Sequence, residues 1–192
     1  MTEGEDRKAE VPLPANCVEE EYLYVTMQRC SCGGTYEHEK QSLVKRGDMP
    51  CDELRVHCKE CGKKRVFVFD ISAFFGDISN YGVIVRPSRL YDVVEWLGLA
   101  ALFIRDSQAL EGEDRRIMLA EADFCLDQAL MFYEGDNNVP VEGAFFHQPN
   151  RTIPKERLRL VSKEHVLGLK ERTKSARFQR GDEDAEQGSK RD

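Results

Sequence analysis

The order of apolar and polar residues divides the chain into a strand-like first half and a helix-like second half. Apolar and polar positions alternate, or β-branched and aromatic residues cluster, in four short ranges typical of β-strands. Gly47-Asp48 lies between the second and third of these and is typical of a tight turn. The ranges are 22–27, 35–46, 52–57 and 65–70. The pattern predicts an antiparallel sheet.

After residue 87 the spacing becomes helical. Pro87 is typical of a helix start, and nearly all residues over 90–104 are apolar. A helix that is apolar all round is normally buried, so we expect this one at the centre of the C-terminal core. A second helix over 114–133 would pack against it as a hairpin. One or two short helices are expected over 152–170, the second capped by Ser162.

The two ends of the chain lack these patterns. Residues 1–21 are rich in charge and carry Pro12 and Pro14 close together, which predicts a flexible acidic leader. Residues 171–192 have mixed charge and predict a disordered tail. Between these ends we expect a β module over 22–75 and a helical region over 76–170. The predicted fold class is α+β.

The charge balance narrows the range of partners. The chain has 28 basic and 35 acidic residues, a net charge of −7, which argues against a protein that coats nucleic acid or an anionic membrane. The sequence has neither the start of a secretion signal nor an apolar run long enough to span a membrane. We therefore expect an intracellular, cytoplasmic protein without membrane contacts. Range 76–150 has 13 acidic and 5 basic residues, which favours a partner with a basic surface.

The most informative feature is a set of four cysteines in two pairs, each followed by glycine. They are Cys30, Cys32, Cys58 and Cys61. Each short turn points two sulfurs at one place, and the glycine lets the backbone curl around a metal. Four thiolates suit a tetrahedral Zn²⁺ and leave no open coordination position, so we predict a structural zinc site without catalysis. The odd total of seven cysteines also fits a metal site with spare thiols better than a set of disulfides.

Two cysteine knuckles, each closing a hairpin, with a strand after the second, resemble the zinc ribbon family over residues 22–72. The resemblance implies that Cys30, Cys32, Cys58 and Cys61 bind zinc. The first knuckle has one residue between its cysteines, where two are commoner in that family. Zinc ribbons share a metal site without sharing a function, so the resemblance does not identify an activity.

Other residues compete for these roles. His38, His57 or Cys51 could replace one of the four cysteines as a ligand, although the two histidines are expected on solvated strand faces. Cys17 is expected to be an exposed thiol in the leader, and Cys125 a small core residue.

A nucleic-acid-binding ribbon is the first alternative function. Basic residues surround the second knuckle, and an aromatic such as Tyr36 could stack on bases. Acidic residues interrupt this patch, which favours a solubilising surface. The basic residues are Lys59, Lys63, Lys64 and Arg65.

An enzyme is the second alternative. The sequence has no serine elbow, phosphate-binding loop, paired metal-binding histidines or dinucleotide fingerprint. Asp123 and Asp127 fall one helical turn apart but are expected to point into water. His147 and His165 are isolated in sequence. A catalytic site would have to be assembled from scattered residues.

The favoured function is a non-catalytic zinc-binding protein that acts as a protein-interaction module. The partner would be another protein or a second copy of this chain. Two aromatic pairs, Phe74-Phe75 and Phe145-Phe146, are expected to pack back onto the core, and would form an association surface if they stay exposed.

Overall fold

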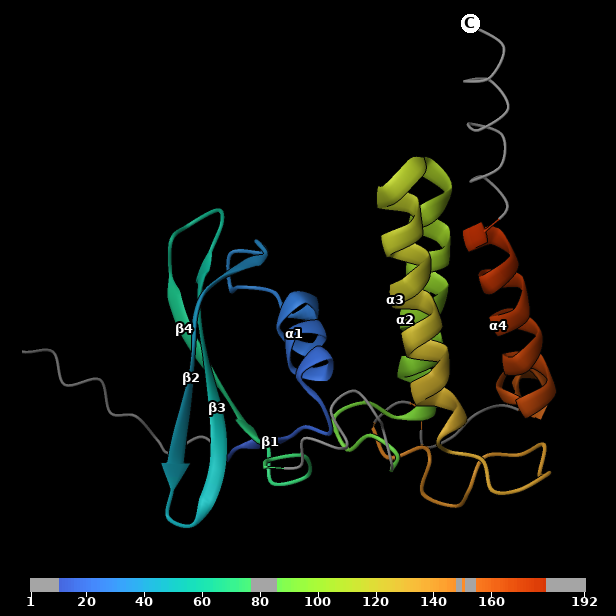
Figure 1. The fold of residues 1–192 in the computed structure, drawn as a ribbon, viewed down its shortest axis with the longest axis horizontal. Helices are drawn as coiled ribbons and strands as arrows, with labels where there is room; N and C mark the ends of the chain where they lie inside the picture. Colours follow the sequence, from blue (N-terminus) through green and yellow to red (C-terminus); the bar gives the residue numbers. More distant parts are fainter. Residues whose placement is uncertain (1–10, 77–85, 148–149, 151–154, 179–192) are drawn as a thin grey trace, which may run out of the picture. The chain divides into compact units, whose positions relative to one another are not determined.

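The computed structural model describes residues 11–76, 86–147, 150 and 155–178 (Figure 1). The chain divides into two compact units, Met1–Leu90 and Tyr91–Asp192. Among its described residues, the first contains a four-stranded sheet and one α-helix, and the second is helical, which confirms the α+β fold class. The boundary follows Leu90 rather than residue 75. No described helix is both long and apolar enough to cross a membrane.

The sheet of the first unit has the strand order β1-β4-β3-β2. The predicted hairpin is confirmed: β2 (Tyr36–Arg46) and β3 (Met49–Cys58) pair antiparallel on either side of the turn at Gly47. Strand β4 (Lys64–Asp70) then pairs antiparallel with β3. The short β1 (Leu13–Pro14) lies parallel to the end of β4.

Helix α1 (Val18–Met27) occupies the range where a strand was expected, so that prediction is wrong. The exposed Glu19 in its first turn favours a helix N-terminus, because its charge complements the helix dipole. The carboxylate of Glu20 also accepts a hydrogen bond from the backbone N–H of Asn16 at 2.7 Å. The prediction of a leader up to residue 21 is therefore wrong for residues 13–21, and residues 1–10 lie outside the described part.

Helix α1 packs on one face of the sheet. Leu23 and Val25 are buried, and the ring of Tyr24 meets Phe67 and Phe69 edge-on at centroid distances of 6.1 and 5.8 Å. Leu54 on β3 is fully buried in the same core. The core is small, as expected for so polar a half of the chain.

The described residues of the second unit form three α-helices with short 3-10 segments. Helix α2 (Val93–Asp106) packs against α3 (Gly112–Leu130), and α4 (Lys163–Phe178) packs against α3 (Figure 1). The 3-10 helices η2 (Ser107–Ala109) and η3 (Lys155–Val161) join them. The prediction of two successive helices that pack together is confirmed, although their bounds differ from the predicted ones.

Helix α2 differs from its prediction in start and surroundings. It begins after Asp92 rather than at Pro87. Its buried residues, Val93, Trp96, Ala100 and Phe103, lie on one face, whereas Gly98 is exposed. The helix is therefore covered on one side instead of being surrounded.

Helix α4 is longer than expected. It begins after Ser162, whose hydroxyl accepts the backbone N–H of His165 at 3.2 Å, so the predicted cap is confirmed. The helix continues to Phe178, which corrects the predicted start of a disordered tail at residue 171. Residues 179–192 lie outside the described part of the chain.

Candidate metal centre

The four cysteines that the sequence singles out come together at one end of the sheet. Cys30 and Cys32 lie in the turn between α1 and β2, and Cys58 and Cys61 lie in the turn between β3 and β4. One ligand atom from each lies within 4.8 Å of the others, a group that could hold a metal ion. Cys30 and Cys58 are buried, whereas Cys32 and Cys61 are exposed.

Both turns are knuckles closed by backbone hydrogen bonds. In the first, the N–H of Gly33 donates to Cys30 O at 2.8 Å, and in the second, the N–H of Gly62 donates to Cys58 O at 2.9 Å. Both glycines have left-handed backbones, with φ of 90° and 71°, which other residues adopt at a cost. The first knuckle closes over one residue fewer, so the shorter cysteine spacing shortens the turn and still delivers both sulfurs.

The sulfur separations fit a tetrahedral ion. A Zn–S bond of about 2.3 Å places neighbouring sulfurs of a tetrahedron about 3.8 Å apart. The sulfurs of Cys30 and Cys61 are 3.7 Å apart, and those of Cys32 and Cys58 are 3.4 Å apart. All four cysteines are free thiols, so these contacts are not disulfides. The residues present therefore fit zinc.

The first thiolate of the group forms most easily at Cys30. Backbone N–H donation from Cys32 lowers the pKa of Cys30 to about 6, against the opposing effect of burial, and the other three sulfurs add to the shift. A thiolate stabilised in this way is ready to bind a cation near neutral pH.

Gly34 lies directly against the second knuckle. A Cβ at this position would be 2.8 Å from Cys58 Sγ and 2.9 Å from Glu60 Cβ. Both distances are shorter than any ordinary contact, so only glycine lets the two knuckles approach this closely.

The other candidate ligands lie elsewhere. His57 is half-buried on the sheet, with Nε2 3.4 Å from Glu37 Oε2 and Nδ1 3.3 Å from Glu39 Oε1. His38 is exposed and its ring lies 5.1 Å from that of Tyr22. Cys51 is fully buried in the sheet. Among the described residues, none of the three joins the group of four cysteines.

The remaining thiols are both buried. Cys125 is a core residue, as predicted. Cys17, expected to be exposed, is 7% exposed as the N-terminal flanking residue of α1, so that prediction is wrong. Burial raises the pKa of Cys17 to about 12, which makes it an inert thiol.

The basic residues around the second knuckle are partly engaged. Lys64 Nζ lies 3.2 Å from Glu39 Oε1, and the guanidinium of Arg65 lies 4.3 Å from the ring centroid of Phe67. These contacts leave fewer cations directed at a phosphate backbone than the sequence suggested.

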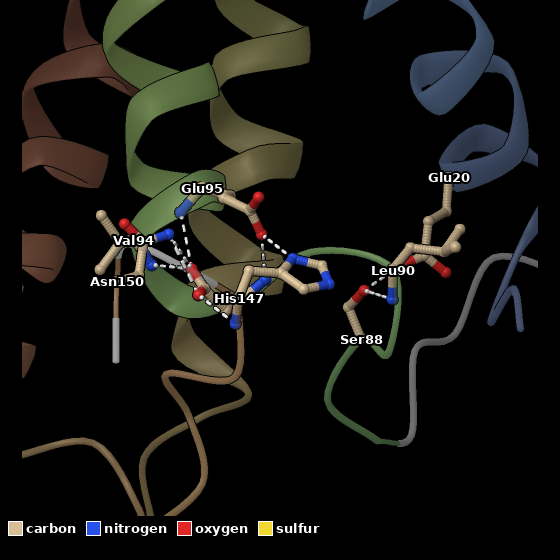
Figure 2. Close-up of polar contacts among 8 residues, drawn as sticks. Glu20, Ser88, Leu90, Val94, Glu95, His147 and Asn150 are labelled. Carbon is tan, nitrogen blue, oxygen red and sulfur yellow. Dashed lines mark hydrogen bonds and ion pairs between the residues drawn. The ribbon is translucent and has the colours of Figure 1, made fainter. Parts of the chain in front are cut away.

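A second group of potential ligands lies at the start of α2, and the sequence reading missed it. Asp92, Glu95 and His147 place one ligand atom each within 4.8 Å of one another. His147 Nδ1 lies 2.6 Å from Glu95 Oε2 (Figure 2). His147, which is isolated in sequence, therefore has a carboxylate partner on α2.

Hydrogen bonds account for this second group without a metal. Asp92 Oδ1 accepts the backbone N–H groups of Val94 and Glu95 at 3.0 and 3.1 Å, and Glu95 Oε2 accepts the N–H of Asp92 at 2.8 Å. This is a capping box. Asp92 Oδ2 accepts from His147 N at 3.2 Å and Asn150 Nδ2 at 3.1 Å. The positive end of the helix dipole beside these carboxylates disfavours a cation, and the hydrogen bonds of Asp92 instead tie the loop to α2.

Asp123 and Asp127 were expected to point into water. Asp127 is exposed, as expected, whereas Asp123 is half-buried. Their carboxylates lie 2.7 and 2.6 Å from Lys170 Nζ and join α3 to α4. His165 is half-buried near the start of α4, in neither of the potential ligand groups found in the described chain.

No protein family, curated protein or solved structure matches this chain.

Proposed function

We propose that this chain is a non-catalytic zinc-binding protein in which Cys30, Cys32, Cys58 and Cys61 hold one structural Zn²⁺. The observation that carries the proposal is the spacing of the four sulfurs, which matches a tetrahedral zinc site. Zinc would cross-link two turns that close a sheet with a small apolar core. With four protein ligands it has no position for a substrate or water.

Metal analysis and unfolding together test this role. Purified protein is expected to contain one zinc per chain. Removing it with a chelator should abolish the near-ultraviolet signal of the sheet unit, because structural zinc supplies folding free energy directly. Cys58→Ser should behave like the metal-free protein, whereas Cys51→Ser, which changes a buried thiol outside the group, should retain zinc. Equal zinc content in both variants would contradict the proposed ligand set.

The second part of the proposal is that the helical unit docks a partner protein. Exposed apolar side chains line a groove of about 580 Å³ between α3 and α4. Ile117 is 49% exposed and Phe178 is 72% exposed there. Two glutamates and two arginines lie beside them: Glu113, Glu121, Arg116 and Arg177. Exposed apolar groups ringed by charge are typical of association sites. The excess of acidic residues over 76–150 favours a partner segment that is apolar with basic flanks.

A comparison of captured proteins tests the docking surface. Ile117→Asp combined with Phe178→Ser should lose a partner that the unmodified protein retains from a lysate. Val139→Asp is the matched control, because Val139 is 65% exposed but does not line this groove. Sedimentation of the same three proteins separates a partner from self-association. If all three capture the same proteins and sediment alike, the groove is not a docking site.

The loop aromatics provide less support for docking. Phe74, Phe145 and Phe146 are half-buried, and Phe75 is 48% exposed. The groove between α3 and α4 therefore replaces these loops as the favoured surface.

A further inference from the structure

One glutamate of α1 is fully buried and has no hydrogen-bond partner. Glu21 is 0% exposed, and neither of its carboxylate oxygens has a partner. An ionised carboxylate without water, a cation or a hydrogen-bond donor is strongly disfavoured. Its neighbour Glu20 is also fully buried, but it accepts a hydrogen bond from the hydroxyl of Ser88 (Figure 2). The backbone N–H of Asn16 also donates to it. The two adjacent glutamates therefore have opposite environments.

The charges that reach Glu21 are all negative. Among these charges, Asp52 on β3 has the largest effect on Glu21. Asp52 is 7% exposed and accepts a hydrogen bond from Gln41 Nε2 on β2 at 2.5 Å. Glu20 and Glu19 on α1 itself are the others. Gln41 is uncharged and is shared with the hydroxyl of Tyr22, which donates to its carbonyl oxygen at 2.8 Å.

These surroundings favour the neutral form of Glu21. Burial, followed by the charge of Asp52, raises its pKa to about 9. Burial also raises the pKa of Glu20, whereas the hydrogen bonds from Ser88 and Asn16 lower it. Glu21 is thus the carboxyl of this pair that no donor stabilises in its charged form.

We propose that docking of α1 on the sheet requires one proton held on the carboxyl group of Glu21, so that loss of this proton to solvent releases the helix. The reaction is a proton transfer with no change of oxidation state, and it is separate from zinc binding. Release would uncover the apolar face that Tyr24 covers at Phe67 and Phe69. Helix α1 also leads into the first knuckle, since only two residues separate Met27 from Cys30.

The sign of the pH dependence follows from the two states. In the released helix Glu21 is exposed and titrates near its ordinary pKa of 4.5, whereas the docked carboxyl titrates near 9. Below both pKa values the Glu21 carboxyl is protonated in each state, so protonation favours neither the docked nor the released helix. Between them the released state loses the proton and the docked state keeps it, so docking weakens by up to about tenfold per pH unit as pH rises.

Hydrogen exchange of α1, measured by mass spectrometry on the full zinc-loaded chain at pH 6 to 9, tests the proposal. After correction for intrinsic exchange, opening of 18–27 should increase with pH by up to about tenfold per unit. Glu21→Gln keeps the shape without the titration, so its opening should be smaller and independent of pH. Glu19→Gln is the matched control, because it removes the same charge from an exposed position of the same helix. It should follow the unmodified protein.

Parallel pH profiles for the unmodified protein and Glu21→Gln would overturn the proposal. Direct titration of the Glu21 carboxyl by carbon NMR gives an independent result that does not require a variant. A midpoint well above 4.5, lowered in Asp52→Asn, supports the proposal. A midpoint near 4.5 overturns it.

Discussion

Replacing Gly34 by alanine tests the geometry of the metal centre most directly. The added methyl group would lie 2.6 Å from Glu60 Cγ, 2.8 Å from Cys58 Sγ and 2.9 Å from Glu60 Cβ. Unlike Gly33, Gly34 is not among the glycines with positive φ, so the backbone itself accepts alanine. The cost of the substitution is therefore steric and falls on a proposed zinc ligand.

The magnitude follows from these contacts. Carbon and sulfur atoms in ordinary contact lie about 3.5 to 4 Å apart, so Cys58 Sγ must move by about 1 Å. The exposed Glu60 Cγ can rotate away, but the sulfur can move only by leaving the tetrahedral arrangement. Overpacking of this kind costs about 1 to 3 kcal/mol. If the zinc-bound state bears that cost, the dissociation constant for zinc increases by about 5- to 150-fold.

Competition with a chromophoric zinc chelator measures this change. The control is Gly47→Ala in the β2–β3 turn, where φ is 64° and an added Cβ meets no atom within 4 Å. That variant should lose about 1 kcal/mol of folding free energy through backbone strain but bind zinc normally. A zinc affinity for Gly34→Ala within twofold of the unmodified protein would show that Cys58 Sγ does not hold zinc beside Gly34.

Three further substitutions test the helical unit by denaturant unfolding. Lys170→Met should lower the free energy of unfolding by about 1 to 2 kcal/mol, because it leaves the Asp123 and Asp127 carboxylates without their cation. Burial lowers the pKa of Lys170, but its hydrogen bonds to both aspartates outweigh the effect of burial, so the pKa is raised. The stability that these contacts contribute is therefore present at neutral pH and is lost as the pH rises through the raised pKa. Gln128→Met should stabilise by about 1 to 3 kcal/mol, because the Gln128 amide is fully buried with neither atom hydrogen-bonded. Loss of stability there would contradict the missing hydrogen bonds. Asp92→Ala should cost about 3 kcal/mol through loss of the cap and the contacts to Asn150, and added zinc should not change that value.

The sheet and the metal centre could be predicted because their signals are local. Cysteine pairs followed by glycine identify knuckles by spacing alone, and Gly47 marks the hairpin turn between two alternating ranges. Pairing of Tyr36 with Cys58 then brings the two knuckles to the same end of the sheet. No distant contact was needed to expect this arrangement.

Helix α1 was missed because two local signals conflict. Tyr22 to Val25 have high strand propensity, and the preceding glutamates resemble a solvated leader. The structure resolves the conflict through tertiary contacts: Glu20 meets Ser88, far along the chain, and Leu23 is buried on the sheet. Strand propensity depends on context, and here the segment is buried as a helix on the face of the sheet.

The polar contacts of the helical unit were missed for a different reason. His147 is 52 residues from Glu95, and Lys170 is 47 residues from Asp123. No single-sequence pattern relates positions so far apart unless the residue types are as distinctive as cysteine. The Asp92-Glu95 spacing does match a capping box, and that local signal could have located the start of α2.

Zinc binding and docking of α1 act on the same strand, which allows a test of whether they are coupled. Strand β3 carries Asp52 beside Glu21 and ends at Cys58 in the metal centre. If zinc holds this strand in the conformation on which α1 docks, adding zinc must slow the hydrogen exchange of α1 by a measurable factor. Linkage then requires docked α1 to tighten zinc binding by that same factor. At pH 9, Glu21→Gln, in which the docked form should dominate, should therefore bind zinc more tightly than the unmodified protein, and this difference should shrink as the pH falls toward 6. Equal affinities at both pH values, together with a zinc-dependent protection of α1, would violate this reciprocity and show that the protonation of Glu21 does not control docking.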